Sequence, residues 1–194
     1  MDADWSVELG ADNPTLVVPW ASDDGVLRYY DLRARPDLLL YIDEAARYRE
    51  IGEFLVTINS LNSLVQSAKC DAWPSRELNE AEAVYGAACK FCSYVDLFFG
   101  DPEARADFSR HEEFATKLAS LLKRAPQISA AAEFIIRRAH FEELDQVSQG
   151  FYFTFELAGY GDDEDEAKKR WIIALNLIGN AILQLSVAKT AKTD

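Results

Sequence analysis

The sequence lacks most of the motifs that indicate an enzymatic activity. Its nine glycines are scattered, so neither a phosphate-binding loop nor a dinucleotide fingerprint is present. It has only two histidines and no nucleophile elbow or zincin motif, which leaves the common hydrolase classes without their signatures. No apolar run reaches the ~18–20 residues that span a bilayer, and we expect no secretory signal in the acidic first residues. The sequence therefore indicates no activity, and its full length resembles no family.

Positive charge and cysteine are also scarce. Lysine and arginine number 20 against 33 acidic residues, which gives a formal net charge of −13. An acidic surface repels phosphate backbones and anionic lipids, so we expect neither nucleic acid nor a membrane as a partner. The three cysteines, Cys70, Cys89 and Cys92, cannot all pair within one chain, and a chain of this size needs no disulfide. These features predict a soluble, cytoplasmic protein.

What the sequence does contain is an ordinary globular composition. Hydrophobic residues make up 49% and charged residues 27% of the 194 residues, which argues against disorder. A chain of this length can bury about 70% of the surface that its unfolded form exposes. No internal repeat or low-complexity linker divides it, so we expect a single globular domain over residues 1–194.

Hydrophobic periodicity predicts the secondary structure. Alternation of apolar and polar residues predicts strands at 5–9 and 151–157. The short run at 15–19, which follows the turn-prone residues 10–14, predicts another strand that forms a hairpin with the first. Spacing of three and four predicts helices over 36–58, 79–99, 101–125, 127–147 and from the acidic run to 188. The strand-prone ends need partners. We therefore predict a helix-rich α+β fold, with about five helices packed on one face of a small antiparallel sheet formed from both chain ends.

The last predicted helix carries the clearest pattern. Its apolar seam alternates small and large residues, which is typical of a helix packed closely against a partner: Ala167, Trp171, Ala174, Ile178, Ala181, Leu185 and Ala188. Before it, Asp162-Asp163-x-x-Glu166 resembles the diphosphate-binding carboxylates of the all-helical prenyl-chain synthases. The chain is short for that bundle, and no second such motif is visible. We favour a helix start, capped by Asp162 or Asp163.

One group of residues suggests a chemical site. Cys89 and Cys92 have the spacing of half a zinc site. If the predicted helices form antiparallel hairpins, His111 and His140 lie at one level, and Cys89 comes opposite Glu112. Together with Glu112 or Glu143, the two cysteines and two histidines then offer a nitrogen and sulfur ligand set that suits zinc. The alternative is that these cysteines and His111 are core residues, because each lies on an apolar helical seam.

The leading functional hypothesis is a soluble, non-enzymatic interaction or structural protein. Asn176, Asn180 and Gln184 form an uncharged polar stripe along the last predicted helix, which suits a contact surface and predicts a homodimer. The competing hypothesis is a small-molecule-binding protein or a metal- or thiol-dependent enzyme, with its site near Cys89, Cys92, His111 and His140. The aromatic residues are numerous enough to line an apolar pocket for such a ligand.

Overall fold

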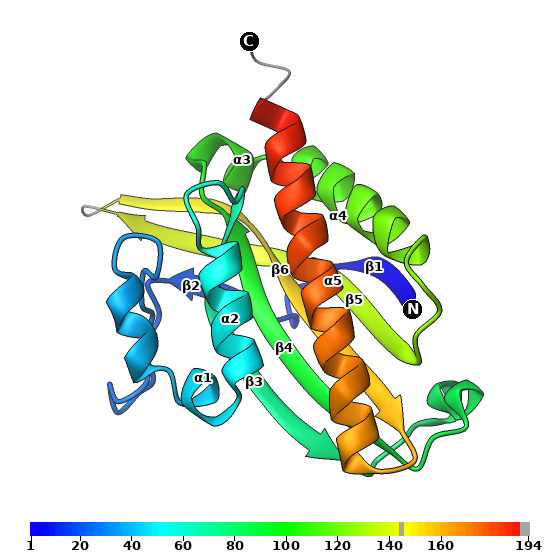
Figure 1. Ribbon diagram of the computed structural model, residues 1–194. Helices are drawn as coiled ribbons and strands as arrows, with labels where there is room; N and C mark the ends of the chain where they lie inside the picture. Colours follow the sequence, from blue (N-terminus) through cyan, green and yellow to red (C-terminus); the bar gives the residue numbers. More distant parts are fainter. Residues whose placement is uncertain (144–145, 191–194) are drawn as a thin grey trace.

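A computed structural model describes residues 1–143 and 146–190 of the chain, which form a six-stranded sheet with helices around it (Figure 1). In chain order the elements are β1 (Asp2–Glu8), β2 (Thr15–Val18), η1 (Pro36–Tyr41), α1 (Asp43–Arg47), α2 (Arg49–Ile58), β3 (Val65–Ser75), η2 (Glu80–Tyr85), β4 (Cys89–Phe99), α3 (Pro102–Ala106), α4 (Phe108–Lys123), β5 (Ala130–Glu143), β6 (Gln146–Gly161) and α5 (Glu164–Thr190). The fold is α+β, but its sheet differs from the predicted one.

The sheet is mixed, with strand order β1-β5-β6-β4-β3. Strands β3 to β6 pair antiparallel, whereas β1 and β2 both pair parallel with β5. The predicted antiparallel sheet, with a hairpin of the first two strands, is therefore wrong. Strand β1 pairs with residues 131–137 and β2 with residues 138–141, so the two follow one another along the same edge of β5. The loop at residues 10–14 moves the chain along this edge and does not reverse it.

The middle of the chain supplies strands β3, β4 and β5, so the predicted helices over 79–99 and 127–147 are also wrong. Strands β4 and β5 each bury residues on both of their faces. Phe91 and Val95 of β4 are buried on one face, and Phe98 is buried on the other. Burial on both faces removes the strict alternation that identifies a strand and leaves an apolar run that also fits a helix. Leu144, which we predicted in the core, lies outside the described residues.

Helices α2, α4 and α5 cover one face of the sheet, which we call the helix-covered face (Figure 1). Helix α5 crosses β6 and β4 between the other two, and Asp163 caps it by accepting from the Glu166 N–H at 2.8 Å. The predicted seam is buried from Ala167 to Ala181. Beneath it, a Cβ at Gly159 would collide with the backbone of Ala167 and Trp171. The small residues of the seam therefore let α5 lie directly on the backbone of β6.

The opposite face of the sheet, which we call the open face, carries one short helix. The ring of Tyr85, at the end of η2, stacks on Tyr160 of β6 with centroids 3.9 Å apart. Lys90 of β4 pairs with Glu82 of η2 at 2.8 Å. The described residues form seven helices, and with η2 on the open face the prediction of about five helices on one face is wrong. Sequence periodicity assigns no face to a helix of six residues.

Helix α5 is long and apolar enough to cross a membrane by length and composition alone, over Glu164–Val187. In this fold its inner side packs on the sheet, and Trp171, Leu175 and Ile178 are almost fully buried. A core helix of a soluble protein meets the same criterion. Its packing is consistent with a soluble protein.

Candidate functional site

The open face of the sheet is covered at its two ends and hollow between them. At one end β2 and the loop after it form a second apolar cluster, which contains Leu16, Val18, Phe98, Ala139, Phe141 and Tyr152. At the other end η2 covers Tyr160. Between these covers lies a groove of about 570 Å³, lined by β1, β3, β4, β5, β6 and η2. We call this hollow the groove.

A hydrogen-bonded chain of polar side chains borders the groove and crosses four strands. Arg137 of β5 donates to Glu8 of β1 at 2.8 Å and to the Thr154 hydroxyl of β6 at 2.7 Å. Thr154 in turn donates to Asp96 of β4 at 2.8 Å. Asp96 is only 7% exposed, and burial raises the pKa of its carboxyl to about 6, although the Thr154 bond opposes that rise. The open face therefore holds a carboxyl group, Asp96, whose charged form is disfavoured by burial.

The next row of side chains brings three carboxylates into the groove. Asp4, Glu133 and Glu156 lie directly opposite one another on β1, β5 and β6, and Tyr94 and Asp71 continue the row across β4 and β3. We call Asp4, Glu133, Glu156 and Asp71 the carboxylate row. Like charges that face each other across strands are destabilising. Burial, followed by the charge of Glu133, raises the pKa of Glu156. The row is thus an arrangement that costs stability in the unbound protein.

The neutralisation of this row inside the chain is weak. The Ser6 hydroxyl, which is a neutral donor, donates to Glu133 at 2.7 Å. The nearest cation to Asp4 is Lys123, whose ammonium lies 4.0 Å away on a half-exposed side chain. Arg137 and Lys90 form ion pairs with carboxylates outside the row, Glu8 and Glu82, although the charge of Arg137 also partly offsets the raised pKa of Glu156. The groove therefore has an excess of negative charge.

Small residues form the floor of the groove and aromatic residues form its walls. Ala131, Ala158 and Cys92 lie side by side in the row next to the carboxylates. Trp73, which is 40% exposed, lies beside Tyr94 with ring centroids 6.4 Å apart. At the other end of the groove stands the stacked pair of Tyr85 and Tyr160. Aromatic faces beside carboxylates suit an organic cation, because both attract positive charge.

The two cysteines proposed as zinc ligands lie on opposite faces of β4. Three residues apart on a strand, their side chains diverge, whereas on a helix they would share a face. The Cys89 thiol donates to the Gly161 carbonyl at 3.5 Å and belongs to the core of the helix-covered face. Cys92 lies in the groove floor, and burial raises the pKa of its thiol to about 11. The sequence analysis expected both cysteines on one face because it assigned residues 79–99 to a helix, whereas Cys89–Phe99 is a strand.

The histidines proposed as ligands are also separate. His111 of α4 is buried, with Nδ1 2.9 Å from the Asp107 carbonyl and Nε2 3.1 Å from the Phe151 carbonyl. Burial lowers the pKa of this imidazole. His140 lies on β5 opposite Gln149. Within residues 1–143 and 146–190, no group of three histidine, cysteine or acidic residues is placed to hold a metal ion. The contacts of Cys89 and His111 favour the alternative to the zinc site, in which both are core residues.

The two acidic residues named with this site lie elsewhere. Glu143 accepts from Arg105 at 2.8 Å at the far end of β5, and Glu112 is in the second turn of α4. Neither belongs to the groove.

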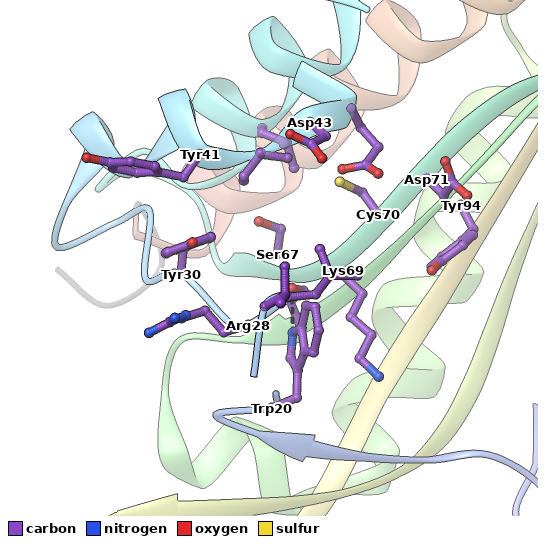
Figure 2. A pocket seen from close by; sticks show the side chains of 16 residues that line it. Trp20, Arg28, Tyr30, Tyr41, Asp43, Ser67, Lys69, Cys70, Asp71 and Tyr94 are labelled. Carbon is purple, nitrogen blue, oxygen red and sulfur yellow. Dashed lines mark hydrogen bonds between the residues drawn. The ribbon is translucent and has the colours of Figure 1, made fainter. Parts of the chain in front are cut away.

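A second hollow of about 340 Å³ lies against the edge strand β3, and we call it the edge pocket (Figure 2). Trp20 lies on one side of it and the stacked rings of Tyr30 and Tyr41 lie on another. Burial raises the pKa of its Cys70 thiol to about 12, so this thiol is protonated at neutral pH. Tyr94 lines both the edge pocket and the groove, so the two hollows adjoin.

Sequence reasoning missed the groove. Asp2, Asp4, Ser6 and Glu8 alternate along β1, which was a usable signal for a polar face. Glu133 and Glu156, by contrast, are single acidic residues within apolar stretches. Only the pairing of β5 with β6 places them together.

Comparisons of the chain with protein-family models, with curated proteins and with solved structures found no match.

Proposed function

We propose that this protein is a non-enzymatic interaction protein whose groove binds a positively charged segment of a partner protein. The observation that carries the proposal is the carboxylate row, in which Asp4, Glu133 and Glu156 stand in register on three adjacent strands. A lysine or arginine side chain placed between these carboxylates would remove their mutual repulsion. The cost of the row in the free protein would thus become affinity in the complex.

The spacing of the row favours organic cations. Neighbouring strands lie about 4.8 Å apart, so each carboxylate of the row is within reach of a long, flexible lysine or arginine side chain. In the part of the chain that the structure describes, no three acidic, histidine or cysteine residues are placed to hold a metal ion. The aromatic walls add further attraction for such groups. A net charge of −13 would also steer a basic partner toward the protein and speed association at low ionic strength.

The chemistry of the hollows favours binding over catalysis. Thiol nucleophiles act as thiolates, and burial keeps both Cys70 and Cys92 protonated near neutral pH by raising their pKa values. His111, a potential general base, is held by two backbone carbonyls in the core. These features weigh against the competing hypothesis of a thiol- or metal-dependent enzyme. All three cysteines are free, which suits the reducing cytoplasm that we propose as the location.

A titration with a short lysine-containing peptide tests the proposal. We expect binding at low ionic strength, weakening as salt rises, and at least ~10-fold weaker binding by the double variant Glu133→Gln/Glu156→Gln. The control is Asp12→Asn, an exposed carboxylate in the loop between β1 and β2 that does not line the groove. It changes the net charge by one unit without altering the groove. Equal affinity of the double variant and the control would contradict the proposal.

We also propose that the protein forms a homodimer through the outward side of α5. The predicted stripe of Asn176, Asn180 and Gln184 is exposed, and Ile173 beside it is 49% exposed. In so acidic a protein, an uncharged surface is where two copies approach with the least repulsion. Light scattering at micromolar concentration should give twice the chain mass, and Asn180→Glu should reduce it. A monomer at all concentrations would disprove the dimer.

A further inference from the structure

The edge pocket continues the groove around the edge of the sheet. The carboxylate row ends at Asp71 of β3, and Asp71 lines the edge pocket together with Tyr94. Figure 2 shows these two side chains at one end of the pocket and Tyr30 and Tyr41 at the other. A chain that lies along the row would therefore reach the mouth of the edge pocket as it passes β3.

The chemistry of the edge pocket differs from that of the groove. Ile42 and Leu55 line it beside the aromatic rings of Trp20 and Tyr30. Its rim exposes large apolar side chains: Val26 is 68% exposed, Leu27 is 57% and Tyr41 is 66%. Exposed apolar residues gathered around a hollow mark an interaction site. At about 340 Å³ the pocket has room for one large side chain and is at the small end of ligand sites, which span about 300–1,000 Å³.

The edge of β3 beside the pocket is closed to a long added strand. Arg33 donates to the Val65 carbonyl at 2.8 Å, Asn59 accepts from the Ser67 N–H at 3.0 Å, and Trp20 donates to the Ala68 carbonyl at 2.9 Å. Further along, Pro74 has no N–H to offer. Side chains thus occupy the backbone groups that an incoming strand would use. A partner segment would cross this edge and not extend along it.

We infer that the partner segment is bipartite: basic residues that lie over the carboxylate row are joined to one large apolar side chain that fills the edge pocket. This inference rests on the proposed function and deepens it. From β1 to β3 the row spans four strand spacings, or about 19 Å, which about six extended residues cover. Basic residues at alternate positions of such a segment face the carboxylates, and the apolar residue follows at the β3 end.

Two pairs of synthetic peptides test this inference. Each peptide carries three lysines that alternate with glycine, and a glycine spacer joins them to a terminal residue. One pair ends in tryptophan or alanine at its carboxyl end, and the other pair carries the same residue at its amino end. We expect one tryptophan peptide to bind the wild-type protein at least ~10-fold more tightly than its alanine partner, because a large side chain leaves water.

The variant Leu27→Ser/Tyr41→Ser locates the apolar side chain. Both residues are more than half exposed, so the variant should fold as the wild type does. The advantage of tryptophan over alanine should fall towards one, while the affinity for the alanine peptide stays unchanged. In Glu133→Gln/Glu156→Gln the reverse is expected: both peptides bind more weakly, but their ratio is kept.

Two results would overturn the inference. One is an equal affinity for tryptophan and alanine peptides in both orientations; charge-dependent binding of the alanine peptides would then leave the proposed function standing. The other is a tryptophan advantage that Leu27→Ser/Tyr41→Ser leaves intact, since the side chain would then bind elsewhere. Failure of every peptide to bind at low ionic strength would reject the proposed function and this inference with it.

Discussion

The two faces of the sheet are made by alternate residues of the same strands, yet they differ in what they contribute. On the helix-covered face, residues such as Phe153 and Phe155 of β6 are buried against α5 and its neighbours. On the open face, Thr154 and Glu156 of the same strand join a polar chain and a row of like charges. The helix-covered face supplies most of the apolar burial that stabilises the fold, and the open face retains groups that folding alone does not favour.

This difference indicates where function and stability are separated. Buried apolar side chains need no further explanation, since burial accounts for them. Carboxylates placed opposite each other across strands, and a carboxyl buried at Asp96, are arrangements that cost free energy. Such groups are where a function is expected in a fold that is otherwise consistent. Four changes test the separation, in order of decreasing expected effect.

Gly159→Ala should be the most damaging single change. Its new Cβ points at the backbone of α5, which has no flexible side chain to move aside, so a loss of about 3 kcal/mol in the free energy of unfolding is expected. The neighbouring Ala158 faces the groove, and Ala158→Leu should change stability by less than about 0.5 kcal/mol while it weakens binding of basic peptides. Urea unfolding measures both. Equal losses in the two variants would mean that the faces are not distinct.

Asp96→Asn should change how stability depends on pH. Because the folded pKa of about 6 is above the value of 3.8 for a free aspartate, the folded protein binds the proton more tightly than the unfolded chain. Stability is therefore lost as pH rises from about 4 to about 6, by about 3 kcal/mol in all. Asp96→Asn should remove this decline. Urea unfolding at pH 4 and pH 7 measures this decline, with Asp12→Asn as the control. If the free energy of unfolding of Asp96→Asn fell with pH as steeply as that of the wild type, Asp96 would not be a buried charge.

Ala174→Leu should cost about 1–3 kcal/mol, because Ala174 is fully buried in the seam where α5 meets the sheet. Asn176→Leu, two residues away on the exposed side of α5, provides the matched control and should leave stability nearly unchanged. Thermal or urea unfolding gives both values. If Ala174→Leu were harmless, the close contact of α5 with β6 would be wrong.

Glu156→Gln should have the smallest effect on stability and the opposite sign. Removing one charge from the facing pair with Glu133 should stabilise the protein by roughly 0.5 kcal/mol at neutral pH. The gain should vanish at acid pH, where Glu156 is protonated; the pKa of this carboxyl is raised, so the gain begins to fade at a higher pH than for an ordinary glutamate. Loss of stability in Glu156→Gln would show that the row is satisfied within the fold.

Part of the fold could be predicted from local sequence. Helix α5 and its seam were predicted because Ala167, Trp171, Ala174 and Ile178 repeat at helical spacing. Asp163 caps the helix, which is expected of an acidic residue that precedes an apolar helical run. Asp101 and Pro102 likewise begin α3 as predicted. The side chain of Ala188, the last residue named in the seam, is outside the described ones. Strand β1 and the middle of β6 followed from their alternation, and β2 from the short apolar run after a turn.

The two strands that were predicted as helices share one cause. Strands β4 and β5 are buried on both faces, so their apolar residues carry no period of two, and a helix was predicted for each. The zinc hypothesis depended on those helices. It placed Cys89 and Cys92 on one helical face, whereas their side chains lie on opposite faces of strand β4. The same error hid Glu133, whose neighbours depend on which strand pairs with β5.

By itself, the sequence determined the acidic surface, the three free thiols and the position of α5, because charge and helical periodicity are properties of the residues and of their near neighbours. Only the tertiary structure decided which face each residue of β4, β5 and β6 occupies and which carboxylates meet. Glu133 and Glu156 lie far apart along the chain, and they face each other because of the register between β5 and β6. Register is strongly specified where one face of the sheet is buried, and which face is buried depends on the elements that pack against it.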